Sequence, residues 1–226
     1  MLSTSPPNSG ATAKRFEPAS VLDQVQIQDL ALSPDGNTVV YSRREVCGNR
    51  YCTHLWVTSW EGSPARQLTH AQANDVEPVI SPDNATVAFV SNRNGKNQVW
   101  LLPLQGGEPR CLTPDLAGVK SVWWSPDGTR LLALAGSGVE RLSVGDPDDP
   151  TARVIDDFWW RLDAVGFLNQ LTSAWVIDVA TEQAVRISDV EWEVLDAQWF
   201  GNDSIVVVAD AAADAGMRRR SEGAAV

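Results

Sequence analysis

A four-residue motif recurs three times along this chain and restricts what the chain can fold into. Ser-Pro-Asp-Gly at residues 33–36 returns as Ser-Pro-Asp-Asn at 81–84 and as Ser-Pro-Asp-Gly at 125–128, so that successive copies begin 48 and 44 residues apart. Proline at the second position of a type I turn presets φ, aspartate hydrogen-bonds nearby backbone, and glycine closes the turn without steric cost. An apolar run follows each copy, which predicts a β-hairpin at each motif.

Other markers keep the same step. Trp56 and Trp100 lie 44 residues apart in Leu-Trp-Val and Val-Trp-Leu runs, and Leu-Thr at 68–69 returns as Leu-Thr at 112–113. Each unit is therefore expected to run turn, strand, turn, strand, turn, short strand. A period of about 40–45 residues with four strands per unit is typical of a β-propeller. We expect the repeated tryptophans, Trp175 included, to pack between neighbouring blades rather than to bind a ligand.

A fourth, degraded unit follows an insertion. Trp175, the Ile-Ser pair at 187–188 and Trp199 each lie 75 residues after their counterparts in the preceding unit. The excess of about thirty residues over the usual step predicts an insertion at about 143–170. The last turn has decayed to Phe-Gly-Asn-Asp at 200–203 but still precedes an apolar run.

The predicted fold is therefore all-β, a β-propeller of four-stranded blades with Ser-Pro-Asp-Gly hairpins, in which about four blades form an incomplete ring. We divide the chain into a disordered amino-terminal tail at 1–18, propeller repeats at 19–210 and a low-complexity carboxy-terminal tail at 211–226. Four blades leave a strand edge and an apolar blade face uncovered. A truncated or frameshifted product, or self-association through the open edge, would each account for this.

Composition excludes several classes of function. The formal net charge of −11 and a pI near 4.6 disfavour nucleic acid as a partner. Three cysteines are too few for a disulfide scaffold and suit a reducing compartment. The first 18 residues show no secretory signal, and no apolar run is long enough to span a membrane. We therefore expect a cytoplasmic protein.

The chain shows no catalytic machinery. It has no Gly-x-Ser-x-Gly nucleophile elbow, and His54 and His70 are its only histidines. Cys47, Cys52 and His54 are close in sequence, but their spacing does not match a zinc knuckle and a fourth ligand is missing. A loop with free thiols is predicted, with a Cys47–Cys52 disulfide only in an oxidising setting. We expect no metal and no cofactor.

The insertion carries the only candidate binding residues. Arg161 and Asp163 follow a Phe-Trp-Trp cluster at 158–160 in a segment that breaks the repeat. Loops on a rigid scaffold often carry binding roles, so Arg161 and Asp163 are candidates for substrate binding. In the simpler interpretation, the tryptophan pair packs against a blade while Arg161 and Asp163 form an ordinary ion pair.

The repeats resemble the WD-like blades of TolB-type propellers and of the amino-terminal propeller of the prolyl oligopeptidase family, in its acylaminoacyl-peptidase and dipeptidyl-peptidase-like branch. The resemblance covers about residues 21–210. The segment 153–167 and the Trp-Val-Ile-Asp-Val-Ala-Thr run at 175–181 are similar to a stretch typical of that branch, although Ala164 stands where the family usually has glycine.

This resemblance implies a non-catalytic role. In that family the propeller caps a carboxy-terminal α/β-hydrolase domain, and peptides reach the serine site through it. The implied partners are peptides or that hydrolase domain, and the chain would gate or bind peptide without cleaving it. A stand-alone TolB-like module that docks another protein is the alternative, and a nonfunctional remnant is the third.

Overall fold

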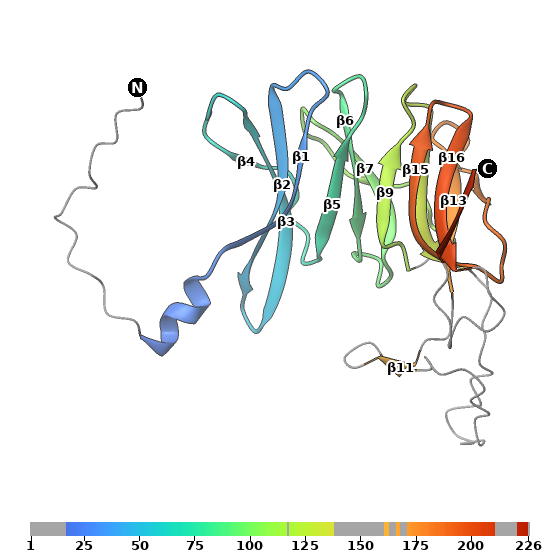
Figure 1. The fold of residues 1–226 in the computed structure, drawn as a ribbon. Coiled ribbons are helices and arrows are strands. Elements are labelled where there is room, and N and C mark those ends of the chain that lie inside the picture. The colour runs from blue at the N-terminus through green and yellow to red at the C-terminus, as the bar shows by residue number, and fades with distance from the viewer. Residues whose placement is uncertain are drawn as a thin grey trace, which may run out of the picture.

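The computed structural model describes residues 17–116, 118–137, 161–162, 166–167, 171–210 and 221–225. Successive antiparallel sheets stand side by side in a row, and the first and last sheets lie at opposite ends of it (Figure 1). Within the described residues the only helix is the short 3-10 helix η1 (Pro18–Asp23). The prediction of an all-β propeller whose ring is incomplete is confirmed. The expected disordered tail lies outside the described residues, except for its last two positions.

Four sheets form the blades. Blade 1 contains β1 (Gln26–Leu32), β2 (Thr38–Cys47), β3 (Arg50–Ser59) and β4 (Arg66–Gln67). Blade 2 contains β5 (Asp75–Ile80), β6 (Thr86–Ser91), β7 (Gln98–Pro103) and β8 (Arg110–Cys111). Blade 3 contains β9 (Ser121–Trp124), β10 (Arg130–Gly136), β13 (Thr172–Asp178) and β14 (Ala184–Arg186). Blade 4 contains β15 (Glu193–Phe200), β16 (Ser204–Asp210) and β17 (Ser221–Ala225).

The expected insertion falls inside blade 3. Gly136 at the end of β10 pairs with Thr172 at the start of β13, so residues 137–171 connect the second and third strands of this blade. Of that connection the structure describes its first and last residues and the two-stranded sheet formed by β11 (Arg161–Leu162) and β12 (Gly166–Phe167).

The carboxy-terminal segment differs from the prediction. The sequence shows no strand pattern after Asp210, yet β17 pairs with β16, with Val206 opposite Ala225 and Asp210 opposite Ser221. Strand pairing uses main-chain groups, and the free edge of β16 offers a row of them to any extended segment. A search for apolar alternation therefore misses a strand of small and polar residues such as β17.

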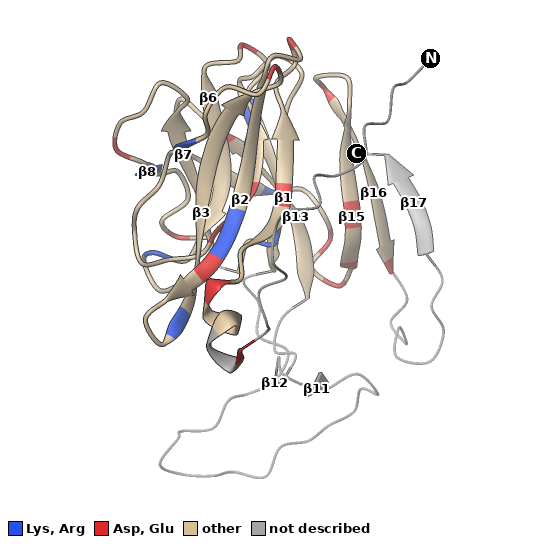
Figure 2. Cartoon of the chain, turned by 90° about the vertical axis from the view of Figure 1, so that its left-hand side faces the viewer, with Lys and Arg blue, Asp and Glu red and all other residues tan. Residues whose placement is uncertain are grey.

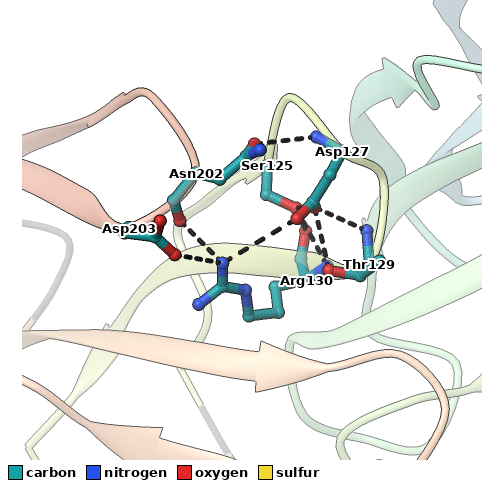
Figure 3. A network of polar contacts seen from close by, with 6 residues as sticks. All are labelled: Ser125, Asp127, Thr129, Arg130, Asn202 and Asp203. Carbon is teal, nitrogen blue, oxygen red and sulfur yellow. Dashed lines mark hydrogen bonds and ion pairs between the residues drawn. The ribbon is translucent and has the colours of Figure 1, made fainter.

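The repeated motif forms the same turn in each blade. In blade 3 the buried Ser125 hydroxyl donates to Asp127 Oδ1 at 2.6 Å and accepts from the Arg130 amide at 3.0 Å, while the Thr129 amide donates to Asp127 Oδ1 at 3.0 Å (Figure 3). Corresponding bonds hold the turns at residues 33–36 and 81–84. The motif therefore encodes a closed hydrogen-bond network, with serine and aspartate as its centre.

The Leu-Thr marker closes the third strand of each blade. The Leu112 amide donates to the Val99 carbonyl at 2.9 Å, and the Val99 amide donates to Thr113 Oγ1 at 3.0 Å. Thr69 makes the same bond to Leu55, and Ser188 makes it to Ala174. The hydroxyl thus supplies an acceptor where the short fourth strand ends.

Each blade is held by burial against its neighbours. One cluster joins blades 1 and 2 and includes Val40, Leu55, Phe89 and Trp100; a second joins blades 2 and 3, and a third joins blades 3 and 4. The expectation that the repeated tryptophans pack between blades is confirmed for Trp100, and for Trp175 against the second cluster. It is wrong for Trp56.

Trp56 lies on the opposite face of blade 1 from its buried neighbours Leu55 and Val57, because side chains alternate along a strand. No described blade stands beyond that face, and the Arg43 guanidinium covers the Trp56 ring at 4.7 Å from its centroid. The tryptophan position is therefore an inter-blade position only where a preceding blade exists.

Polar contacts between successive turns add to the apolar clusters. Asn202 Oδ1 accepts from the Asp127 amide at 3.1 Å, and Arg130 donates to the Asn202 carbonyl at 2.7 Å and lies 3.6 Å from Asp203 (Figure 3). Asn84 likewise accepts from the Asp35 amide, at 3.3 Å. The turns thus connect blades 1 and 2 and blades 3 and 4.

We expect Ser125→Ala to lower the free energy of unfolding by about 1–3 kcal/mol, because the buried Arg130 amide and the Asp127 carboxylate each lose a partner. Urea denaturation followed by tryptophan fluorescence measures this. Ser63→Ala, in the exposed turn after β3, is the control and should change stability by less than about 0.5 kcal/mol. Equal effects of the two substitutions would contradict the structural role of the motif.

Acid should weaken the fold through the same turns. The hydrogen bond from Ser125, followed by those from Thr129, lowers the pKa of Asp127 from 3.8 to about 2, and the pKa values of Asp35 and Asp83 are also lowered. A lowered folded-state pKa stabilises above the unfolded value, and that stability is lost as pH falls from about 4 to about 2. Denaturation between pH 5 and about 2 should show this loss. It should be smaller in the triple variant Asp35→Asn, Asp83→Asn, Asp127→Asn, and an unchanged slope would refute this assignment.

Candidate functional site

The predicted binding residues remain predictions. Arg161 begins β11, where its backbone pairs with Phe167, but its side chain is not described, and Asp163 lies outside the described residues. The Phe-Trp-Trp cluster at 158–160 also lies outside them. The structure therefore places the Arg161 backbone in a small hairpin between the second and third strands of blade 3.

An acidic pair on the first strands of blades 1 and 2 was not predicted. Strands β1 and β5 lie side by side, and each has a β-bulge, between Ile27 and Leu30 and between Val76 and Val79. Asp29 lies in the first bulge and Glu77 in the second. The Glu77 amide donates to Asp29 Oδ2 at 3.3 Å, so the bulges bring two carboxylate side chains to adjacent positions.

Glu77 is held in an unusual environment. Its φ of 52° is in the left-handed region, which costs a non-glycine residue of order 1–3 kcal/mol and often marks functional positions. Burial, and then the charge of Asp29, raise the pKa of Glu77, while a hydrogen bond with Ser121 of β9 opposes them. Among the described residues neither carboxylate forms an ion pair. The pair therefore suits a ligand that brings hydrogen-bond donors or positive charge.

A sulfur and imidazole cluster lies at the far end of the β2–β3 hairpin. Ligand atoms of Cys47, Cys52 and His54 all lie within 4.8 Å of one another, with Cys52 and His54 buried and Cys47 half-buried. Both thiols are free, and burial, with a hydrogen bond from Cys47, raises the pKa of Cys52 to about 11. The structure thus brings together three residues for which the sequence suggested only a loop.

The segment carrying these residues is a regular hairpin, which corrects the expected loop. Cys47 pairs with Arg50 and Glu45 pairs with Cys52 across a turn at residues 48–49, where Gly48 adopts a φ of 68°. Strands β2 and β3 each have 10 residues, against 6 in β6 and β7. Basic and acidic residues alternate along the projecting end of this hairpin (Figure 2).

The outer face of blade 1 is apolar and uncovered. Leu30 is 69% exposed and Leu32 is 50% exposed, and Tyr41 pairs with Leu30 on the same face. At the corresponding positions of blade 2, eight residues after the motif serine and immediately before it, Phe89 and Ile80 are buried against blade 1. Blade 1 therefore presents the residue types of an inter-blade contact without a described neighbour.

No helix in the described part of the chain has the length and apolar character needed to cross a membrane.

Four-stranded antiparallel sheets packed face to face define the class of protein, a β-propeller module. The sequence profile of the TolB beta propeller domain matches residues 23–157, more than half of the chain. The chain belongs to the TolB beta propeller domain family.

Two curated relatives are peptidases by name. The chain is 32% identical over 125 residues to the uncharacterized peptidase YuxL of Bacillus subtilis, an alignment that covers 54% of this chain and 19% of YuxL. It is 29% identical over 161 residues to dipeptidyl-peptidase 5 of Porphyromonas gingivalis, covering 69% of this chain and 24% of that protein. The chain thus spans a quarter or less of the length of these relatives.

Solved structures share the fold. Acylaminoacyl peptidase from Pyrococcus horikoshii aligns with a TM-score of 0.66 at 23% identity, over 84% of this chain and 28% of that one. A putative TolB from Agrobacterium tumefaciens aligns with a TM-score of 0.57 at 19% identity, over 89% of this chain and 58% of that one. These similarities establish the propeller fold.

Glu77→Gln should stabilise the protein at neutral pH. A raised folded-state pKa means that Glu77 contributes stability below its unfolded pKa and loses it as pH rises through the folded value. We expect a gain below about 1 kcal/mol at pH 7, because water screens a half-exposed carboxylate, and a smaller gain near pH 4. Urea denaturation at both pH values measures it. The exposed Glu191→Gln is the control, and a gain equal to that of the control at both pH values would contradict the strained environment of Glu77.

Proposed function

We propose that this chain is the non-catalytic propeller portion of a prolyl oligopeptidase-family, acylaminoacyl-peptidase-like serine peptidase. In this role it gates or binds peptides and acts together with an α/β-hydrolase domain that is not part of this sequence. The observation that carries the proposal is the identity shared with two peptidases over a segment that makes up a quarter or less of each.

The bare faces of the end blades support this assignment. Leu30 and Leu32 on blade 1 and Leu195 and Phe200 on blade 4 are exposed apolar residues at the two ends of the row. Large exposed apolar faces usually mark contacts with other protein surfaces. Further blades or a second domain would cover them, and a second copy of this chain is the alternative occupant.

The described chemistry fits a non-catalytic role. The sequence contains no nucleophile elbow, His54 is packed beside two cysteines, and His70 is an exposed loop residue. Peptide contacts are assigned in this proposal to Arg161 and Asp163. Three unpaired cysteines among the described residues support a reducing, cytoplasmic location as part of it.

The purified chain should not hydrolyse N-acyl-amino-acid or dipeptide p-nitroanilides above the uncatalysed rate, since it lacks a nucleophile activated by a base. Release of nitroaniline followed by absorbance measures this. Turnover that is abolished by a serine-directed inhibitor would overturn the proposal.

The second test is peptide binding. If Arg161 and Asp163 contact the peptide, the double variant Arg161→Ala, Asp163→Ala should bind an N-acylated peptide at least about tenfold more weakly, as expected for lost charge-assisted hydrogen bonds. Isothermal titration calorimetry measures the affinity. The control variant Lys96→Ala, Asp115→Ala removes one cation and one anion from exposed positions of blade 2. Equal affinities of the two variants would exclude Arg161 and Asp163 as contacts.

A stand-alone TolB-like interaction module is the second candidate, favoured by the likeness to the putative TolB structure, of which this chain covers 58%. Capture of one specific protein by the intact chain, lost on deletion of residues 147–170, would support it over the peptidase assignment. A nonfunctional remnant would instead show weak protection in hydrogen exchange across all blades.

A further inference from the structure

The projecting end of the β2–β3 hairpin carries chemistry that peptide handling does not use. Glu45 pairs with Cys52 and Arg43 pairs with His54, and Cys47 follows Glu45 by two positions on the same strand. Side chains alternate along a strand, so these five residues share one face of the hairpin. Cys47, Cys52 and His54 therefore meet although four residues separate the two cysteines in sequence.

The donor atoms are already close to the spacing that one ion needs. Ligand atoms of all three residues lie within 4.8 Å of one another. Around one tetrahedral zinc ion, Zn–S bonds of about 2.3 Å and Zn–N bonds of about 2.0–2.1 Å place neighbouring donor atoms roughly 3.5–3.8 Å apart. Side-chain rotations that close about 1 Å would complete this arrangement without a change in strand register.

An independent observation points to a missing partner. His54 is 6% exposed, and its Nδ1 is buried without a hydrogen-bond partner among the described residues. Buried polar atoms almost always have a partner, and neutral imidazole nitrogen is the commonest protein ligand for zinc and related metals. A metal ion would supply that partner.

We propose that Cys47, Cys52 and His54 form a binding site for one soft divalent cation of the zinc type, with water as the fourth ligand. The carboxylate of Glu45 shares the face, but it pairs with Arg43 at 3.2 Å and does not belong to the cluster, which leaves the fourth position to solvent. Half-buried Cys47 gives an ion access from that side. Two thiolates balance the charge of the ion, and each ion bound releases two thiol protons.

This proposal departs from the expectation of no metal. The spacing of the two cysteines does not match a zinc knuckle, but a knuckle places its ligands in one tight turn. Here the ligands come from two paired strands, and the strand register determines which side chains meet. The inference does not depend on the proposed peptidase role.

The test uses the full chain in a non-thiol reductant and cobalt(II) as the probe, followed by zinc. We expect one cobalt ion per chain, with visible ligand-field bands of tetrahedral cobalt and a near-ultraviolet thiolate-to-cobalt charge-transfer band, both removed by zinc. Zinc should also protect two of the three thiols from a disulfide reagent.

Two variants separate the cluster from general thiol binding. Cys47→Ser should weaken cobalt binding at least tenfold and abolish zinc protection, while Cys111→Ser, which removes the third free thiol, should bind cobalt as the parent chain does. Cys47 is half-buried near the hairpin turn, so its variant should keep the fold, which circular dichroism checks. Absence of the charge-transfer band, its persistence in Cys47→Ser or its loss in Cys111→Ser would overturn the proposal.

Discussion

A blade of this protein has two apolar faces, and each face can be buried only by the next blade. In β7, Leu101 packs in the cluster with blade 3 while the adjacent Trp100 and Leu102 pack in the cluster with blade 1, because strand side chains alternate. Stability therefore accumulates from nearest-neighbour interfaces, as in other repeat proteins. The same dependence explains why Trp56 and Leu30, at equivalent inter-blade positions or on the same face, stay partly or largely exposed when no blade precedes them.

The turn motif has a second role that follows from this stacking. Its fourth position faces the turn of the preceding blade, where Asn84 bonds the Asp35 amide. Between blades 2 and 3 that position is Gly128, with a φ of +71°, and an added Cβ would lie 3.4 Å from the Pro82 ring. The choice between asparagine and glycine therefore matches two kinds of contact, a hydrogen bond and a close packing of rings and backbone. One short motif both closes a hairpin and sets the spacing of blades.

Repetition made the blades predictable from the sequence, because each repeated residue performs one local task. The serine and aspartate of the turn, the Leu-Thr pair and the inter-blade tryptophans all follow from that logic. The acidic pair could not be predicted: Asp29 and Glu77 lie 48 residues apart and meet only because two bulges shift the register. The cysteine cluster was seen in the sequence but misjudged, because hairpin register rather than loop spacing determines its geometry. Strand β17 lacks an apolar pattern, and Arg161 and Asp163 stay predictions.

The positions that do not repeat are therefore the informative ones for function. Serine, aspartate, threonine and tryptophan at the repeated positions are occupied by hydrogen bonds or packing that every blade needs. Cys47, Cys52, His54 and Glu77 recur in no other blade, and the structure gives the blade architecture no use for them: His54 keeps an unpaired nitrogen, and Glu77 keeps a left-handed backbone and an unfavourable neighbouring charge. Retaining such features costs stability that a purely structural blade would not need to lose. Ligands at these two places would offset that cost, which is why the search for function in this propeller belongs at its irregular residues and not at its repeated ones.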